Sequence, residues 1–120
     1  MKIQFFTDLI VWQRGHELVL LIYHLTQNFP DIEKYGLIAQ MRRSSSSITA
    51  NLAEGFGRRG LADETRFYDI SVGSLYELQD QLFIARDMNY VSTESFQKCF
   101  SLSQEVQRLI VALIRSIRSK

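Results

Sequence analysis

The residue types that most often perform chemistry are sparse in this 120-residue chain. It contains two histidines, His16 and His24, and a single cysteine, Cys99. A di-iron site in a helical bundle needs Glu-x-x-His pairs on two helices, and neither histidine lies three positions after a glutamate. Cys99 has no second cysteine with which to share a metal or a disulfide. We therefore expect no metal site and no cofactor.

Two motifs could suggest catalysis. Gly55 to Gly60 reads G-x-G-x-x-G, but a dinucleotide site needs a strand before it, and a helical pattern stands there instead. We interpret these glycines as a helix stop and a turn that tolerates positive φ. The serines at 44–47 lack a G-x-S-x-G elbow, so they predict close helix packing with hydroxyls bonded back to carbonyls. An enzyme built on Glu54, Glu77 and these serines is the weakest of our alternatives.

Polar residues at spacings of three and four form a stripe on each of the two central predicted helices. One interpretation is a pair of solvated faces, stabilised by pairs such as Glu54 with Arg58. The other is a polar network between helices or subunits that fixes their register. Both interpretations remain open from the sequence. The stripes consist of Gln40, Arg43, Ser47, Asn51, Glu54 and Arg58, and of Arg66, Ile70, Ser74, Glu77 and Gln81.

Two arginine pairs are candidates for binding nucleic acid. Arg42-Arg43 and Arg58-Arg59 are separated by sixteen positions, or about 24 Å along one helix. Repeated in a ring of subunits, they could bind phosphates. The interpretation that we favour is ordinary solvated arginines beside nearby carboxylates. The net charge of +1 gives no bulk electrostatic footprint for nucleic acid.

The elements that must position these residues are helices. Apolar residues recur in steps of three and four, and no segment alternates with period two. Short connections force antiparallel neighbours, so the prediction is an all-α, antiparallel up-down-up-down four-helix bundle. Thr7 or Asp8, and Ser92 or Thr93, are the expected caps of the first and last helices. The expected single domain is 1–120, with helices over about 8–28, 36–56, 63–89 and 92–118.

The first and last predicted helices carry more apolar residues than one bundle seam requires. A soluble monomer rarely exposes so large a patch, so we expect the chain to associate with copies of itself. The apolar runs are too short to span a bilayer, and we expect no membrane partner. A lone cysteine favours a reducing, cytoplasmic location. The additional apolar residues are Trp12, Val19, Leu20, Tyr23, Leu102, Leu109, Val111 and Ile114.

The residues Ser47-Ile48 and Asn51-Leu52-Ala53-Glu54-Gly55 resemble the S-[IV]-x-x-N-[IL]-A-E-G signature of a bacterial four-helix-bundle family. Its members are often encoded in intervening sequences inserted into 23S ribosomal RNA genes. Matches outside this signature extend the resemblance over nearly the whole chain. They are Val11-Trp12, Phe29-Pro30, Glu33, Gly36-Leu37, Gln40-Met41-Arg42-Arg43, Gly73-Ser74-Leu75 and Glu77-Leu78.

The resemblance implies a bundle that assembles into a homopentameric ring. A related branch, the accessory proteins of diversity-generating retroelements, forms basic pentamers that bind nucleic acid and a reverse transcriptase. This chain departs from that branch, because five copies would carry a charge of only about +5. The signature positions that carry over are Ser47, Asn51, Glu54, Gly55, Gly73, Ser74 and Glu77. We interpret their role as hydrogen bonding between helices or subunits.

These observations favour a non-enzymatic, self-assembling protein that acts as a binding partner or scaffold for RNA or a nucleoprotein. The alternative is a regulator that presents a helical groove to a protein partner without binding nucleic acid.

Overall fold

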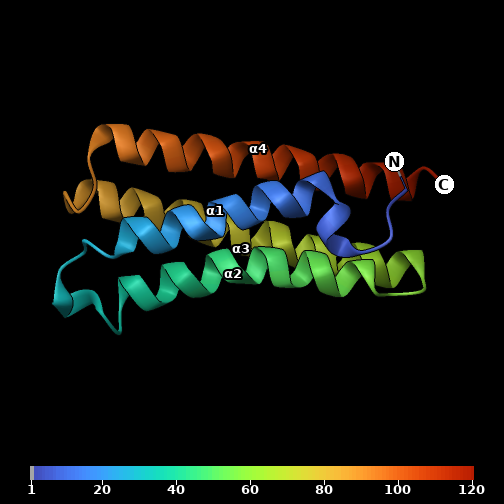
Figure 1. Ribbon diagram of the computed structural model, residues 1–120, viewed down its shortest axis with the longest axis horizontal. Coiled ribbons are helices and arrows are strands. Elements are labelled where there is room, and N and C mark those ends of the chain that lie inside the picture. The colour runs from blue at the N-terminus through green and yellow to red at the C-terminus, as the bar shows by residue number, and fades with distance from the viewer. Residues whose placement is uncertain (1) are drawn as a thin grey trace.

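The computed structural model describes residues 2–120 and contains four long helices. They are α1 (Ile10–Thr26), α2 (Leu37–Phe56), α3 (Leu61–Asp87) and α4 (Thr93–Arg118). Successive helices run in opposite directions, as the prediction of an up-down-up-down bundle required (Figure 1). Short 3-10 turns at Phe6–Asp8 and Asp31–Glu33 precede α1 and α2.

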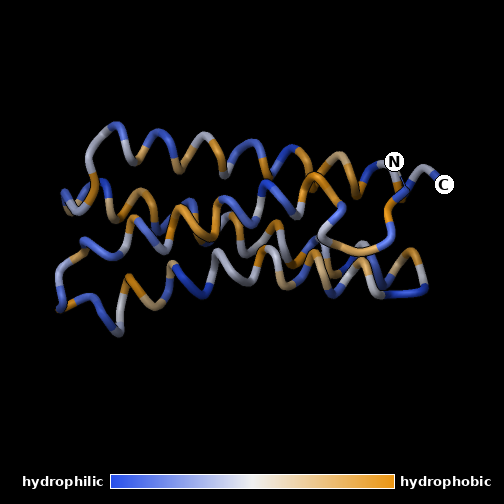
Figure 2. Tube along the Cα trace, in the orientation of Figure 1, coloured by the Kyte–Doolittle hydropathy of each residue, from blue (hydrophilic) through white to orange (hydrophobic). Residues whose placement is uncertain are grey.

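The core lies along the seams that the periodicity predicted. Hydrophobic and hydrophilic segments alternate along the helices (Figure 2). Leu18, Ile48, Leu78 and Val106 are fully buried. α1 packs against α2 and α4, and α3 packs against the same two helices. Among the described residues α1 and α3 make no contact, so they occupy diagonal corners of the bundle.

Local signals at the helix ends explain most of the boundaries. Ser92 caps α4 by accepting a hydrogen bond from the backbone N–H of Ser95, at 3.0 Å. Neither Thr7 nor Asp8 caps α1, whose N-cap is Leu9. The Asp8 carboxylate instead accepts the backbone N–H groups of two preceding residues, which holds the 3-10 turn in place of a first helical turn. This is why α1 begins at Ile10, later than expected.

The turn before α3 corrects one expectation. No glycine in the described chain has a positive φ, and Gly57 ends α2 with φ −80°. α3 then begins at Leu61, two residues before the expected start. A positive φ occurs instead at Asn89, where it is 62°, and this residue interrupts the helical backbone between α3 and α4.

The additional apolar residues are divided between core and surface. Val19 and Ile114 belong to the core, while Leu20, Tyr23 and Val111 remain exposed. Trp12, Leu102 and Leu109 are half-buried against the core. The expected apolar surplus on the first and last helices is therefore smaller than the sequence suggested. None of the helices within residues 2–120 has the length and apolar character needed to cross a bilayer.

Candidate functional site

The signature residues of α2 and α3 meet at the interface between these helices. The Ser47 and Ser74 hydroxyls are 2.9 Å apart and hydrogen-bonded. The Asn51 side-chain amide donates to the Ser47 carbonyl at 2.8 Å and to the Ser47 hydroxyl at 3.1 Å. The three side chains are partly buried and form one polar cluster, which we call the serine–asparagine cluster.

A second polar contact lies further along the same interface, toward the start of α2. The Ser44 hydroxyl donates to the side-chain oxygen of Gln81 at 2.7 Å, and both residues are buried. The Gln81 amide donates in turn to Glu77 at 3.4 Å. Ser71 donates to the carbonyl of Ile48 at 2.8 Å. Each interpretation therefore holds for part of the stripes: some members are bonded between or along the helices, namely Ser47, Asn51, Ser74 and Gln81. The others lie on exposed faces, namely Gln40, Arg43, Glu54, Arg58, Arg66, Ile70 and Glu77.

Gly55 lets α2 and α3 approach closely. A Cβ at this position would lie 2.6 Å from Cε1 of Tyr68 and 3.0 Å from the backbone oxygen of Glu64. The Tyr68 hydroxyl donates to the Glu64 carboxylate at 2.7 Å, and burial followed by this hydrogen bond raises the pKa of Tyr68 above its ordinary range. Gly73 is different, because a Cβ there would meet no atom within 4 Å.

Glu54 and Glu77 do not form a catalytic pair. Glu54 lies near the end of α2, exposed, and accepts a hydrogen bond from Arg58 at 2.8 Å. Glu77 is level with Ser44, ten residues or about 15 Å away along the helix. Ser44 and Ser46 also donate to carbonyls three residues earlier, as the packing interpretation predicted. This arrangement presents neither paired carboxylates nor a serine activated by a base.

The four candidate arginines have two different environments. Arg42 donates to the Thr26 hydroxyl at 2.9 Å and its guanidinium lies 4.8 Å from the centre of the Tyr23 ring. Arg58 pairs with Glu54 and approaches Asp63 at 3.7 Å. Arg42 therefore links α2 to α1, and the charge of Arg58 is partly neutralised by carboxylates.

Arg43 and Arg59 are exposed and have no carboxylate within 4 Å among the described residues. Lys98 and Arg108 on α4 share this condition, and the sequence reasoning missed them. Lys98 and Arg108 are not adjacent in sequence, so only their positions around α4 could have shown that both lie along the same hollow.

Sequence reasoning also missed two links to α4. The buried Gln79 amide of α3 donates to Ser103 at 3.1 Å and to Gln107 at 3.2 Å. Arg14 of α1 holds Glu105 through both of its carboxylate oxygens, which lowers the pKa of Glu105. The sequence did offer a signal for Gln79, because this polar residue directly follows Leu78, which lies on the apolar seam of α3.

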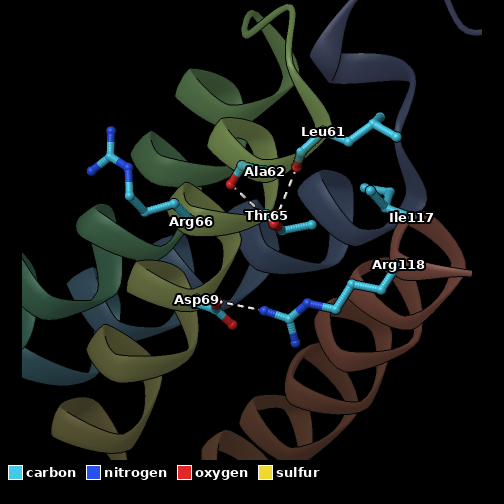
Figure 3. A pocket seen from close by; sticks show the side chains of 7 residues that line it. All are labelled: Leu61, Ala62, Thr65, Arg66, Asp69, Ile117 and Arg118. Carbon is cyan, nitrogen blue, oxygen red and sulfur yellow. Dashed lines mark hydrogen bonds and ion pairs between the residues drawn. The ribbon is translucent and has the colours of Figure 1, made fainter.

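A hollow lies at the start of α3, and its polar groups are engaged in bonds within the chain. It has a volume of about 410 Å³ and lies between the first turns of α3 and the end of α4 (Figure 3). Arg118 crosses it to pair with Asp69 at 3.0 Å, and Thr65 donates to the carbonyls of Leu61 and Ala62. Its polar groups are therefore bonded to one another.

No group of three or more metal-ligating side chains occurs in the part of the chain that the structure describes. Cys99 is buried and unpaired, and burial raises the pKa of its thiol to about 11 despite the nearby Lys98. A protonated, buried thiol is a poor nucleophile.

Comparisons with known proteins agree with this architecture. The family model described as 23S rRNA-intervening sequence protein matches residues 7–112. A solved structure of a protein with unknown function from the S23 ribosomal protein family of Bacteroides thetaiotaomicron VPI-5482 superposes with a TM-score of 0.79. It is 22% identical, and the match covers 88% of this chain and 98% of that one, which supports the shared fold. No curated protein matches the sequence.

Proposed function

The chain belongs to the family of 23S rRNA-intervening sequence proteins. We propose that it is a self-assembling scaffold without catalytic activity. The resemblance seen in the sequence makes a homopentamer the working model. Each copy would contribute one bundle, and the assembled ring would present repeated surfaces to a partner.

The observation that carries this proposal is the apolar surface left on α3 after the core is closed. Ile70 is 41% exposed, Tyr76 is 56% exposed and Ile84 is 44% exposed. These side chains are spread along the exposed surface of α3, and burial against another molecule would remove their apolar area from water. A second copy of the chain is always available for that purpose and commonly supplies it.

Sedimentation velocity at micromolar concentration tests the assembly. We expect a mass several times the 14.0 kDa of one chain. A single species at the monomer mass would overturn the proposal.

Structured RNA is the ligand that we propose for the assembled form, and Arg43 and Arg59 are the residues with which we expect it to interact. Both are exposed and form no ion pair with any of residues 2–120, so neutralising phosphates with them would release counterions. Repetition around a ring would concentrate this charge, which a single chain at +1 does not show.

The RNA proposal is tested by filter binding at several salt concentrations. We expect Arg43→Gln with Arg59→Gln to weaken binding and to flatten its dependence on salt. Lys34→Gln, on the connection between α1 and α2, is the control for loss of a positive charge elsewhere on the chain. Wild-type protein that shows no salt-sensitive binding would remove RNA from the proposal while leaving the assembly.

The alternative function is regulation of a protein partner at a helical groove, and the hollow between α1 and α4 is the observation that favours it. Affinity purification that recovers one stoichiometric protein and no nucleic acid would select this alternative.

A further inference from the structure

Two surfaces on different sides of the bundle carry charges of opposite sign, Lys98 and Arg108 on one and Glu77 and Asp80 on the other. We propose that the outer stripe of α3 in one copy docks into the groove between α1 and α4 of the next copy. This inference rests on the self-assembly proposed above and identifies the surfaces that meet.

The groove consists of two adjoining hollows of about 250 and 470 Å³ that share Leu21 and Lys98. Its lining is mixed, with Leu21, Leu25 and Leu102 among polar and charged residues. Along α4 it extends from Ser95 to Arg108, thirteen residues or about 20 Å. A groove of this length between two helices fits a third helix that lays an apolar face into it.

The rim of the groove carries three cations, Arg14, Lys98 and Arg108, against two carboxylates, Glu17 and Glu105. Lys98 and Arg108 are exposed, and among the described residues neither has a carboxylate within 4 Å. The carboxylate of Glu105 lies between them in sequence, but it is held by Arg14. An occupant with acidic residues in the middle of an apolar face would complement this pattern.

The α3 stripe has the composition that such an occupant needs. Its five residues recur in steps of three and four and all are exposed. Isoleucines stand at both ends, fourteen residues or about 21 Å apart, and acidic residues stand between them. Asp80 has no ion pair in the described chain, and Glu77 receives only the amide of Gln81. The α3 stripe consists of Ile70, Gly73, Glu77, Asp80 and Ile84.

Gly73 adds an observation that the monomer alone does not explain. A glycine inside an exposed helix costs about 1 kcal/mol relative to alanine. No atom lies within 4 Å of a Cβ built at Gly73, so nothing in its own chain requires the glycine. In the middle of the α3 stripe, it would let the walls of a neighbour's groove approach the α3 backbone.

The contact cannot form within one chain. The diagonal placement of α1 and α3 puts the α3 stripe on a different side of the bundle from the groove. Each copy would therefore use both surfaces, one toward each neighbour. Such a head-to-tail contact either closes into a ring or continues as a filament.

Charge reversal tests the pairing. The groove variant is Lys98→Glu with Arg108→Glu, and the stripe variant is Glu77→Lys with Asp80→Lys. Measured by sedimentation at low ionic strength, each variant alone should weaken assembly by roughly tenfold or more, because like charges then face each other. An equimolar mixture should assemble again, because each variant complements the other. Asp31→Lys with Lys34→Glu, on the connection between α1 and α2, is a control for charge reversal away from both surfaces and should assemble like the wild type.

The outcomes separate the two proposals. If the wild-type chain is a monomer, self-assembly fails, and this inference fails with it. If the wild type assembles and both variants assemble equally well, the scaffold proposal stands and the pairing is overturned. Variants that weaken assembly without recovery in the mixture also overturn the pairing. Gly73→Ala provides a test without any change of charge: we expect weaker assembly from a chain that is itself more stable, and unchanged assembly would contradict close approach at this position.

Discussion

The ring of Tyr68 lies directly against the backbone of Gly55, at the point where α2 and α3 converge before their connecting turn. A single methyl group at Gly55 would lie 2.6 Å from Cε1 of the ring. Tyr68 is 1% exposed and its hydroxyl is held by Glu64, so the ring has little freedom to move away. The glycine of the signature therefore has a steric role in the fold.

We expect Gly55→Ala to destabilise the folded chain by about 1–3 kcal/mol, as overpacking of a closed interface generally does. The gain in helix propensity from alanine is smaller and does not offset the clash. Urea denaturation followed by circular dichroism measures the difference. A variant as stable as the wild type would show that α2 and α3 separate at no cost.

Gly73→Ala is expected to have the opposite effect on the stability of the chain. No atom lies within 4 Å of the added methyl group, so only the propensity gain remains, about 0.5–1 kcal/mol. The same denaturation experiment applies, at a concentration at which the protein is dissociated. A loss of stability there would mean that the site is occupied within the monomer.

Arg42 and Arg43 are adjacent in sequence but should respond differently to lysine. Arg42→Lys loses the fork that reaches both Thr26 and the carbonyl of Tyr23, and we expect a loss of about 1 kcal/mol in unfolding free energy. Arg43→Lys changes an exposed side chain without a partner, and we expect no measurable change. Thermal denaturation of the two variants side by side provides the comparison, and equal stability of both would refute it.

The thiol of Cys99 should make the fold sensitive to alkaline pH. Its pKa is raised from 9.0 to about 11 in the folded chain, chiefly by burial. Above pH 9 the unfolded thiol loses its proton first, so the unfolded state gains stability and the fold loses it until about pH 11. The raised pKa of Tyr68 acts in the same direction above pH 10.

We expect stability to decline from pH 9 to 11, and the decline should be smaller in Cys99→Ala. Denaturation at a series of pH values measures both slopes. Alkylation of Cys99 should also be slow in the native protein and fast in urea. Rapid native alkylation would show that the thiol is not buried.

The four helices were predictable because apolar residues recur at helical spacing throughout the chain. The cap of α4 was predicted as Ser92 or Thr93, and the structure assigns it to Ser92, whose hydroxyl accepts the backbone N–H of Ser95. The start of α1 was not predictable, because Asp8 could cap either the helix or the turn before it. The choice depends on how Gln4 and Phe5 fold back, which periodicity does not describe.

The surfaces were harder to predict than the core. From the sequence, Arg42 and Arg43 are two equivalent cations, and only the position of Tyr23 on α1 distinguishes them. Periodicity likewise placed Val19 and Ile114 off the seam, although a closed bundle of four helices buries a wider face of each. Ile70 and Gly73 are notable only in the structure, where Ile70 is partly exposed and none of residues 2–120 places an atom within 4 Å of a Cβ built at Gly73.

The buried amide of Gln79 restricts how the last two helices can align. Sliding α4 by one turn past α3 would pull Ser103 and Gln107 away and leave a polar group stranded in a dry interior. Leucine at this position would tolerate such a slip, because apolar contacts have no direction and leucine could pack against any apolar side chain of α4. Gln79 thus fixes the register of α4 against α3, so that every copy of the chain presents the same surface to its neighbours.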